Sequence, residues 1–144
     1  MQRKGGDKMT FTDYNSLPDS LESDELRTYF EEYIRIYKDK PKTLDALKEL
    51  YELAYRQWDT YELLDKDISH TLEEYLISAI NLRSHDIMDV ILSIVENLSL
   101  KNAFDHIISC KPQVTVPSVA RLIEEAEEEY SDSIGNPYSD DFDW

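Results

Sequence analysis

Residues 84–98, SHDIMDVILSIVENL, decide the fold class of this chain. Apolar side chains recur here at spacings of three and four, which is the period of a helix. Ser84 is a residue type that caps helix N-termini, and Asp86 lies in the first turn, where a carboxylate complements the helix dipole. Ile87, Met88, Val90, Ile91, Ile94, Val95 and Leu98 leave this helix little polar surface. We therefore expect it to be the most buried helix of the protein.

The same spacing recurs on both sides of this stretch, each time after a capping residue or a proline. The expected starts are 20–24, Thr43, Ser69 or Thr71, Ser99, and Thr115 followed by Pro117. The apolar positions are Leu26, Phe30, Tyr33 and Tyr37; Leu44, Leu47, Leu50, Tyr51, Ala54 and Trp58; Leu72, Tyr75, Leu76, Ala79, Ile80 and Leu82; Leu100, Phe104, Ile107 and Ile108; and Val119, Leu122, Ile123 and Ala126. Residues 113–116 are expected to be a short extended link, and their two valines would also suit a small strand.

These patterns predict an all-α fold of about six helices in antiparallel pairs, over residues 23–58, 69–98 and 100–130. The length of each pair approximates a HEAT- or armadillo-type repeat, which has about 40 residues. No repeat consensus is visible, so an orthogonal helical bundle remains the alternative. We expect a flexible N-terminal leader over 1–19, a single helical domain over 20–130 and an acidic-aromatic C-terminal tail over 131–144. Residues 4–8, KGGDK, precede Met9, and because codons for such a stretch can spell a ribosome-binding site, we expect bacterial translation to start at Met9.

The charge balance restricts the class of partner. The chain has 31 acidic residues against 15 Lys and Arg, a formal net charge of −16. Such a surface repels nucleic acid and anionic membranes and attracts basic proteins, although it also serves solubility alone. The single cysteine suits a reducing compartment, and no apolar run is long enough to cross a bilayer. We therefore expect a cytoplasmic protein whose partner is a basic protein, with the oligomeric state left open.

Patterns typical of catalysis or metal binding are missing. No two of His70, His85 and His106 have a metal-ligand spacing, and Cys110 with His106 makes too few ligands for zinc. Residues 65–69 resemble the start of an EF-hand loop, but the sixth position is His70 and the twelfth is Leu76. Adjacent acids such as 31–32 and 73–74 are typical of solvated helix faces. The sequence therefore predicts a protein that is not an enzyme and needs no cofactor.

Aromatic side chains are concentrated in the first two predicted helices. Tyr29, Tyr33 and Tyr37 follow one another at spacings of four. Tyr51, Tyr55 and Trp58 likewise follow at spacings of four and three. Tyr33, Tyr37, Tyr51 and Trp58 also belong to the apolar stripes, so we expect some of them in the core. Tyr29 and Tyr55 lie off the stripes and are candidate partner-binding residues, because tyrosine is enriched among binding hot spots. Tyrosines at the core boundary are the alternative.

The C-terminal tail combines acids with aromatics. Residues 124–144 contain nine Asp and Glu and no Lys or Arg. Further candidate partner-binding residues are Glu128, Tyr138, Asp140, Asp141, Phe142, Asp143 and Trp144. Such a segment can dock onto a basic surface as a flexible arm. Plain disorder and folding back of Phe142 and Trp144 onto the helices remain alternatives.

The acidic surface, the aromatic side chains and the absence of catalytic patterns together predict a protein-binding module that inhibits a basic protein. Basic nucleases are the obvious targets. Residues 74–110, EYLISAINLRSHDIMDVILSIVENLSLKNAFDHIISC, resemble small helical immunity proteins of bacterial polymorphic toxin systems, including contact-dependent inhibition. The resemblance implies a cytoplasmic antidote that binds its cognate toxin domain and blocks the active site. These families share no fixed inhibitory motif, so no residue role is transferred. The alternative function is a HEAT-like scaffold or regulatory adaptor that binds a host protein.

Overall fold

The computed structural model describes residues 14–132 and residue 134. This part of the chain contains six α-helices, two short 3-10 helices and no strand, so the predicted all-α class is confirmed. The helices are α1 (Ser23–Tyr37), α2 (Leu44–Trp58), α3 (Lys66–Ala79), α4 (His85–Leu98), α5 (Lys101–Ser109) and α6 (Pro117–Tyr130); the 3-10 helices are η1 (Tyr14–Ser16) and η2 (Lys111–Gln113). Residues 113–116, whose valines would also suit a small strand, form the end of η2 and irregular backbone.

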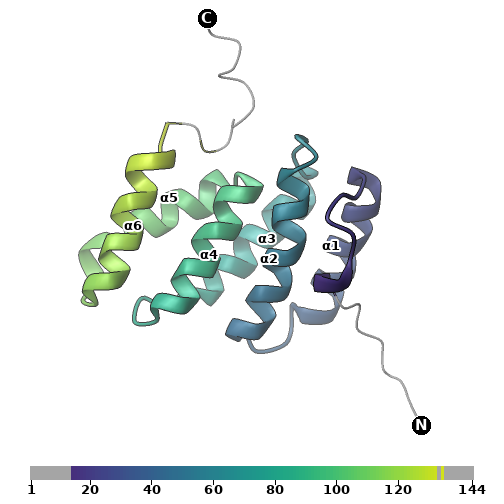
Figure 1. Ribbon diagram of the computed structural model, residues 1–144. Helices are drawn as coiled ribbons and strands as arrows, with labels where there is room; N and C mark the ends of the chain where they lie inside the picture. The colour runs from purple at the N-terminus through teal and green to yellow at the C-terminus, as the bar shows by residue number, and fades with distance from the viewer. Residues whose placement is uncertain (1–13, 133, 135–144) are drawn as a thin grey trace, which may run out of the picture.

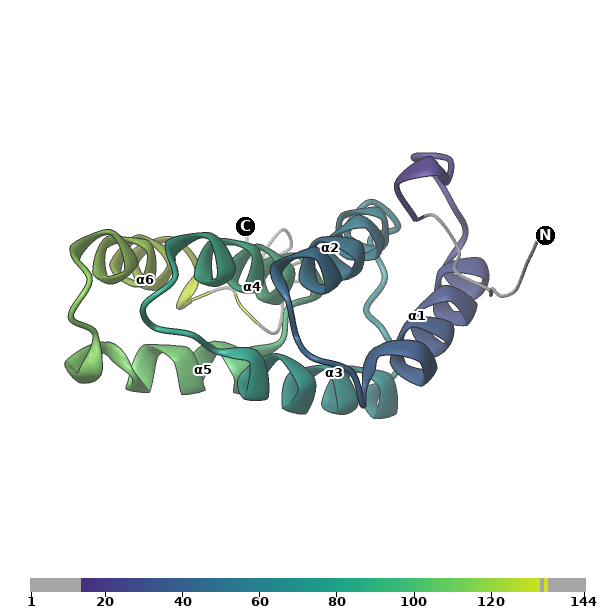
Figure 2. The same cartoon turned by 90° about the horizontal axis from the view of Figure 1, so that it is seen from below.

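The helices stack in two layers. Helices α2, α4 and α6 lie side by side in one layer, and α3 and α5 form the other (Figures 1 and 2). Helix α1 closes one end of the stack and packs against both α2 and α3. Helix α4 lies between α2 and α6 and also contacts α5, which explains why its sequence is apolar on most sides. The turns α1–α2, α3–α4 and α5–α6 all lie at one edge, which faces the viewer in Figure 2.

Some helices begin where the capping residues in the sequence predict, and others do not. Thr43 Oγ1 accepts a hydrogen bond from Ala46 N (3.1 Å), and Ser84 Oγ accepts one from Ile87 N (3.2 Å). The expected caps of the third and fifth helices are wrong. Helix α3 begins at Lys66, ahead of Ser69 and Thr71, and Ser99 ends α4 in the left-handed conformation at φ 57°. The chain reverses at Ser99, which therefore terminates one helix and does not cap the next.

Glu73 departs from the solvated face expected for the 73–74 acid pair. Its side chain is 7% exposed on α3, and its carboxylate accepts hydrogen bonds from Ala103 N (3.0 Å) and Asn102 Nδ2 (3.3 Å). Both donors lie in the first turn of α5, where backbone N–H groups have no partner within the helix. Glu73 thus caps α5 from a neighbouring helix, with favourable charge at its positive end.

We expect Glu73→Ala to lower the free energy of unfolding by about 2 kcal/mol, because it leaves a buried N–H group unpaired. Glu74→Ala, at the exposed neighbouring position, is the matched control and should change stability by less than about 0.5 kcal/mol. Urea denaturation followed by circular dichroism measures both. Equal losses in the two variants would contradict the capping role of Glu73.

The packed part of the chain extends beyond both ends of the expected 20–130 domain. Tyr14, placed by sequence in the flexible leader, is 1% exposed and donates a hydrogen bond to Glu32 Oε1 (2.8 Å). At the other end, Ile134 is 7% exposed, and its N–H donates to Tyr130 O (2.8 Å). The described part of the tail therefore contributes the Ile134 side chain to the core.

Tyrosines join the first three helices inside the stack. Tyr33 is fully buried, and its hydroxyl donates to Ala46 O (2.7 Å) and lies 2.9 Å from Tyr75 Oη. The Tyr33 ring stacks on Tyr37 at a centroid distance of 4.4 Å. Burial raises the pKa of Tyr33 and Tyr75, so both hydroxyls remain neutral donors. Tyr33 therefore lies in the core, and Tyr37 is partly buried against it.

Candidate interaction face

The large apolar side chains that remain exposed in the described residues all belong to α2 and the loop after it. They are Tyr51 (36% exposed), Trp58 (38%), Tyr61 (74%) and Leu63 (50%). Scattered exposed apolar residues are normal, but a concentrated group marks a surface for a partner. This grouping makes the outer side of α2 the candidate interaction face.

Three aromatic residues define what we call the α2 face: Tyr51, Tyr55 and Trp58. The rings of Tyr51 and Tyr55 lie 5.7 Å apart, and Trp58 follows Tyr55 by three positions on the same side of the helix. The predicted apolar stripe of this helix included Tyr51 and Trp58, and for these two residues it is wrong, because both are exposed. Helix α2 packs against α4 on one side and α1 and η1 on the other, so its buried arc is displaced from the predicted stripe. The buried positions are Ala46, Leu47, Leu50, Leu53, Ala54, Arg56 and Gln57.

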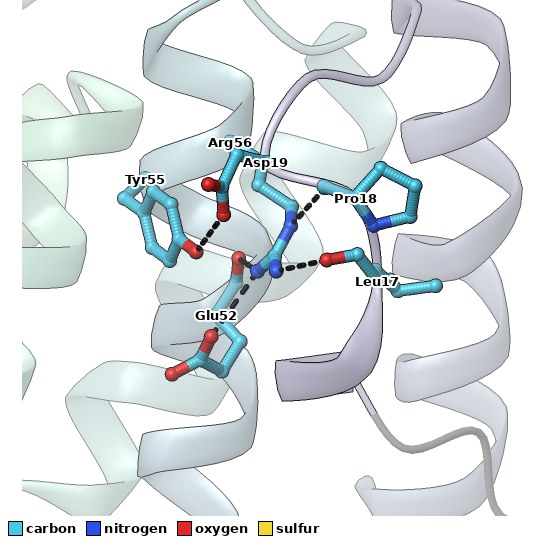
Figure 3. Close-up of polar contacts among 6 residues, drawn as sticks. All are labelled: Leu17, Pro18, Asp19, Glu52, Tyr55 and Arg56. Atoms are coloured by element: carbon cyan, nitrogen blue, oxygen red, sulfur yellow. Dashed lines mark hydrogen bonds and ion pairs between the residues drawn. The ribbon is translucent and has the colours of Figure 1, made fainter.

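A buried arginine, Arg56, connects α2 to the segment that precedes α1 (Figure 3). Arg56 is 1% exposed, and its guanidinium donates to Leu17 O (2.8 Å), Pro18 O (2.8 Å), and the backbone and side-chain oxygens of Glu52 (2.6 and 3.1 Å). These contacts hold residues 17–19 against α2. The guanidinium also lies over the Tyr55 ring, 4.7 Å from its centroid.

Tyr55 is held from its hydroxyl end as well. Its Oη donates to Asp19 Oδ1 at 3.4 Å, a contact that depends on the segment bound by Arg56 (Figure 3). The ring is therefore fixed at both ends, although the side chain is only half-buried. An aromatic held in this way loses little conformational entropy when a partner binds to it.

The loop after α2 presents Tyr61 outward. Tyr61 has φ 59°, a left-handed conformation that is uncommon for a residue other than glycine. Neighbouring hydrogen bonds maintain it: Gln57 Nε2 donates to Glu62 O (2.7 Å), Thr60 Oγ1 donates to Gln57 O (2.7 Å), and Tyr61 N donates to Trp58 O (3.2 Å). Strained backbone of this kind is concentrated at functional sites.

Carboxylates surround the same end of α2. A hollow of about 450 Å³ next to the α2 face is lined by Glu22, Asp24, Asp59 and Glu62, with no Lys or Arg among the described residues that form it. We call it the acidic hollow. Glu62 Oε1 accepts a hydrogen bond from Ser23 Oγ (2.8 Å), which connects the loop to the start of α1. A basic side chain placed here would meet several carboxylates and no cation from the described lining residues.

The structure does not bring all the predicted partner-binding residues together. Tyr29 packs edge-to-face on Tyr14 at 6.1 Å, and Tyr55 contacts Asp19, so both flank the segment 14–19. Glu128 is exposed on α6, at the far end of the stack from α2 (Figure 1). The remaining predicted site residues lie outside the described part of the chain: Tyr138, Asp140, Asp141, Phe142, Asp143 and Trp144.

Sequence reasoning missed Trp58, Tyr61 and the buried Arg56. Trp58 was assigned to the stripe of α2, and no sequence signal shows which arc of a helix faces two neighbours. The left-handed Tyr61 has no local marker such as glycine. Arg56 resembles any surface arginine until the 17–18 carbonyls are placed beside it.

Among the described carboxylates, Glu96 on α4 is the one whose pKa is clearly shifted by its surroundings. Burial raises the pKa of Glu96 to about 7, and repulsion from Glu129 and Asp89 acts in the same direction. The folded-state pKa lies above the usual 4.5, so the folded protein binds this proton more tightly than the unfolded chain. Stability contributed by the proton is complete below about pH 4.5 and is lost as pH rises through about 7.

We expect Glu96→Gln to raise the free energy of unfolding at pH 8 by about 1–2 kcal/mol, a value discounted for the partial exposure of the side chain. At pH 4, where the carboxyl is protonated, the gain should vanish. Glu125→Gln, at an exposed position on α6, is the control and should show little pH-dependent gain. Urea denaturation at the two pH values measures the difference, and an equal gain at both would contradict the raised pKa.

Among the described residues, no group of three or more His, Cys, Asp or Glu side chains is arranged to hold a metal ion. No helix in the same part of the chain is long and apolar enough to cross a membrane. In comparisons with known proteins, no family model, no curated protein and no solved structure matches this chain.

Proposed function

We propose that this chain is an immunity-type inhibitor that binds a basic toxin domain through the α2 face and the acidic hollow. The observation that carries the proposal is the concentration of exposed aromatics beside uncompensated carboxylates at one end of the stack. Tyrosine and tryptophan dominate binding hot spots because they bury a large area at low entropic cost. The resemblance of residues 74–110 to helical immunity proteins supports the same class.

The acidic hollow and the α2 face would affect different rate constants of binding. The carboxylates of the acidic hollow would accept Lys or Arg side chains of the toxin and accelerate association. The aromatics of the α2 face would slow dissociation by excluding water around these ion pairs. A nuclease places basic residues at its active site to bind phosphate, so an inhibitor that covers them with carboxylates blocks substrate entry.

Genetics and growth provide the first test. We expect a toxin gene immediately next to the gene for this chain, and co-expression of the two should restore growth that the toxin alone prevents. An isolated housekeeping locus, or a toxic neighbour whose effect persists on co-expression, would argue against an immunity role.

Binding of the purified toxin domain tests the face itself. Trp58→Ala should weaken binding about 30-fold or more, as expected of a central aromatic anchor. Asp59→Asn with Glu62→Gln should slow association at low salt, whereas Glu125→Gln with Asp132→Asn removes the same charge from exposed positions on and after α6. Surface plasmon resonance separates the two rate constants. If both double variants slowed association equally, the attraction would be nonspecific, and the acidic hollow would have no role in binding.

The tail requires a truncation chosen from the structure. Deleting residues 131–144 would remove Ile134 from the core, so the deletion should cover 135–144 only. If the tail is a binding arm, this truncated chain should bind the toxin more weakly at low salt while its melting temperature is unchanged. Unchanged affinity would exclude the tail and leave the α2 face as the proposed site.

The layered stack also favours a second candidate function, a scaffold or regulatory adaptor that binds a host protein. Stacked helical pairs present extended surfaces along their edges, which suits adaptor proteins. This alternative predicts a gene without a toxin neighbour. The Trp58→Ala variant would then weaken binding to a host partner with no effect on bacterial growth.

A further inference from the structure

A second surface lies at the edge formed by the three turns α1–α2, α3–α4 and α5–α6 (Figure 2). A groove of about 940 Å³ runs there between the two helix layers. It is lined by Lys42 before α2, by residues 77–83 at the end of α3 and in the following turn, and by the end of α5 and the segment that leads to α6. The groove and the α2 face therefore lie towards opposite ends of α2.

The charge of this groove is opposite to that of the protein. Lys42, Arg83 and His106 line it, and no Asp or Glu is among its described lining residues, although the chain contains 31 acids. Lys42 and Arg83 form no ion pair with any described residue; Lys42 Nζ instead lies 5.1 Å from the centroid of the Tyr75 ring. Two cations that pair with no described acid, in a chain of charge −16, create a local site for an anionic ligand.

The groove also has the polar and apolar features that bind an extended peptide. Ile77, Ile80 and Leu82 are half-buried in its wall, where a partner side chain could cover them. Asn81, Gln113 and Thr115 supply exposed hydrogen-bonding groups along the same wall. This combination suits a segment that alternates carboxylates with apolar side chains, and it does not suit a small anion alone.

We propose that this groove binds an acidic, apolar-containing peptide segment of a second partner protein. Charge complementarity selects the acidic class, and the half-buried isoleucines and leucine select apolar side chains within it. The interaction is independent of the toxin-binding proposal because it uses the opposite end of α2 and the opposite charge. The chain would thus hold a basic protein at one edge and an acidic segment at the other.

The probe is a fluorescein-labelled peptide of about ten alternating Asp and Leu residues, which spans about 33 Å when extended. We expect it to bind the full chain, and Lys42→Glu with Arg83→Glu to weaken binding at least about tenfold in fluorescence anisotropy. The matched control is Lys48→Glu with Arg121→Glu, which makes the same charge change at exposed positions outside the groove. A peptide in which Ser replaces Leu should bind at least about tenfold more weakly than the original. Circular dichroism melts verify that all variants fold.

Several results would overturn the proposal. No binding of the Asp-Leu peptide at about 1 mM, or equal weakening by both double variants, would show that the groove has no specific affinity for acidic segments. A tenfold gain in peptide affinity after deletion of 135–144 would identify the chain's own C-terminal segment as the occupant. A self-association lost only in the groove variant would identify a second copy of this chain.

Discussion

Replacing Arg56 with methionine is expected to lower the free energy of unfolding by about 3 kcal/mol. Methionine fills much of the same volume but donates nothing, so the Leu17 and Pro18 carbonyls and the Glu52 carboxylate lose their partner. Arg56→Lys should recover only part of the loss, because an ammonium group cannot reproduce the planar fork that reaches three residues. Urea denaturation of the parent protein, Arg56→Lys and Arg56→Met gives the order of their free energies of unfolding.

Arg27→Met is the matched control for this prediction. Arg27 also pairs with a carboxylate, Asp65 Oδ2 at 3.0 Å, but its side chain is 54% exposed. Exposed pairs contribute about 0–1 kcal/mol, so this variant should remain close to the parent. Hydrogen exchange of the Leu17 N–H, which donates to Tyr14 O, should also speed up in Arg56→Met and not in Arg27→Met. Equal stability of the two variants would contradict the proposed role of Arg56 in holding this segment.

Ile91→Asp is expected to abolish folding. Ile91 is fully buried on α4, the helix that contacts both α2 and α6. An unpaired carboxylate there costs several kcal/mol, which is comparable with the whole stability of an ordinary domain. The far-ultraviolet circular dichroism of the variant should therefore lack the cooperative thermal transition of the parent protein.

Two substitutions on the same helix provide controls. Ile91→Val keeps the site apolar and should cost about 1 kcal/mol. Ser93→Asp introduces the same charge at a partly exposed position and should leave a cooperative transition. A normal melting temperature for Ile91→Asp would mean that α4 faces the rest of the stack differently.

Interactions within a few residues of each other were predictable from the sequence. The caps Thr43 and Ser84 bond to backbone groups three positions ahead, and Pro117 begins α6, so local residue types were sufficient there. The apolar period of residues 84–98 likewise predicted a deeply buried helix, since α4 has neighbours on several sides.

The candidate interaction face was predictable only in outline. The sequence placed an aromatic cluster in the first helical pair and selected Tyr55, but it put Tyr51 and Trp58 on the apolar stripe. The reason is that periodicity gives the mean direction of a buried stripe, whereas the width and centre of the buried arc depend on how many helices pack against it. The groove could not be predicted at all, because its cations come from turns far apart in the chain.

The sequence by itself determined six helices, the caps of α2 and α4 and the charge of the chain, because these depend on residue types and on spacings of three and four. Tertiary structure alone decided that Glu73 caps α5 and that Arg56 ties residues 17–19 to α2. It also decided that the acidic hollow and the cationic groove occupy opposite ends of α2. Each of these joins groups 29 or more positions apart or from separate turns, and no local pattern records which distant group a buried donor or carboxylate will meet.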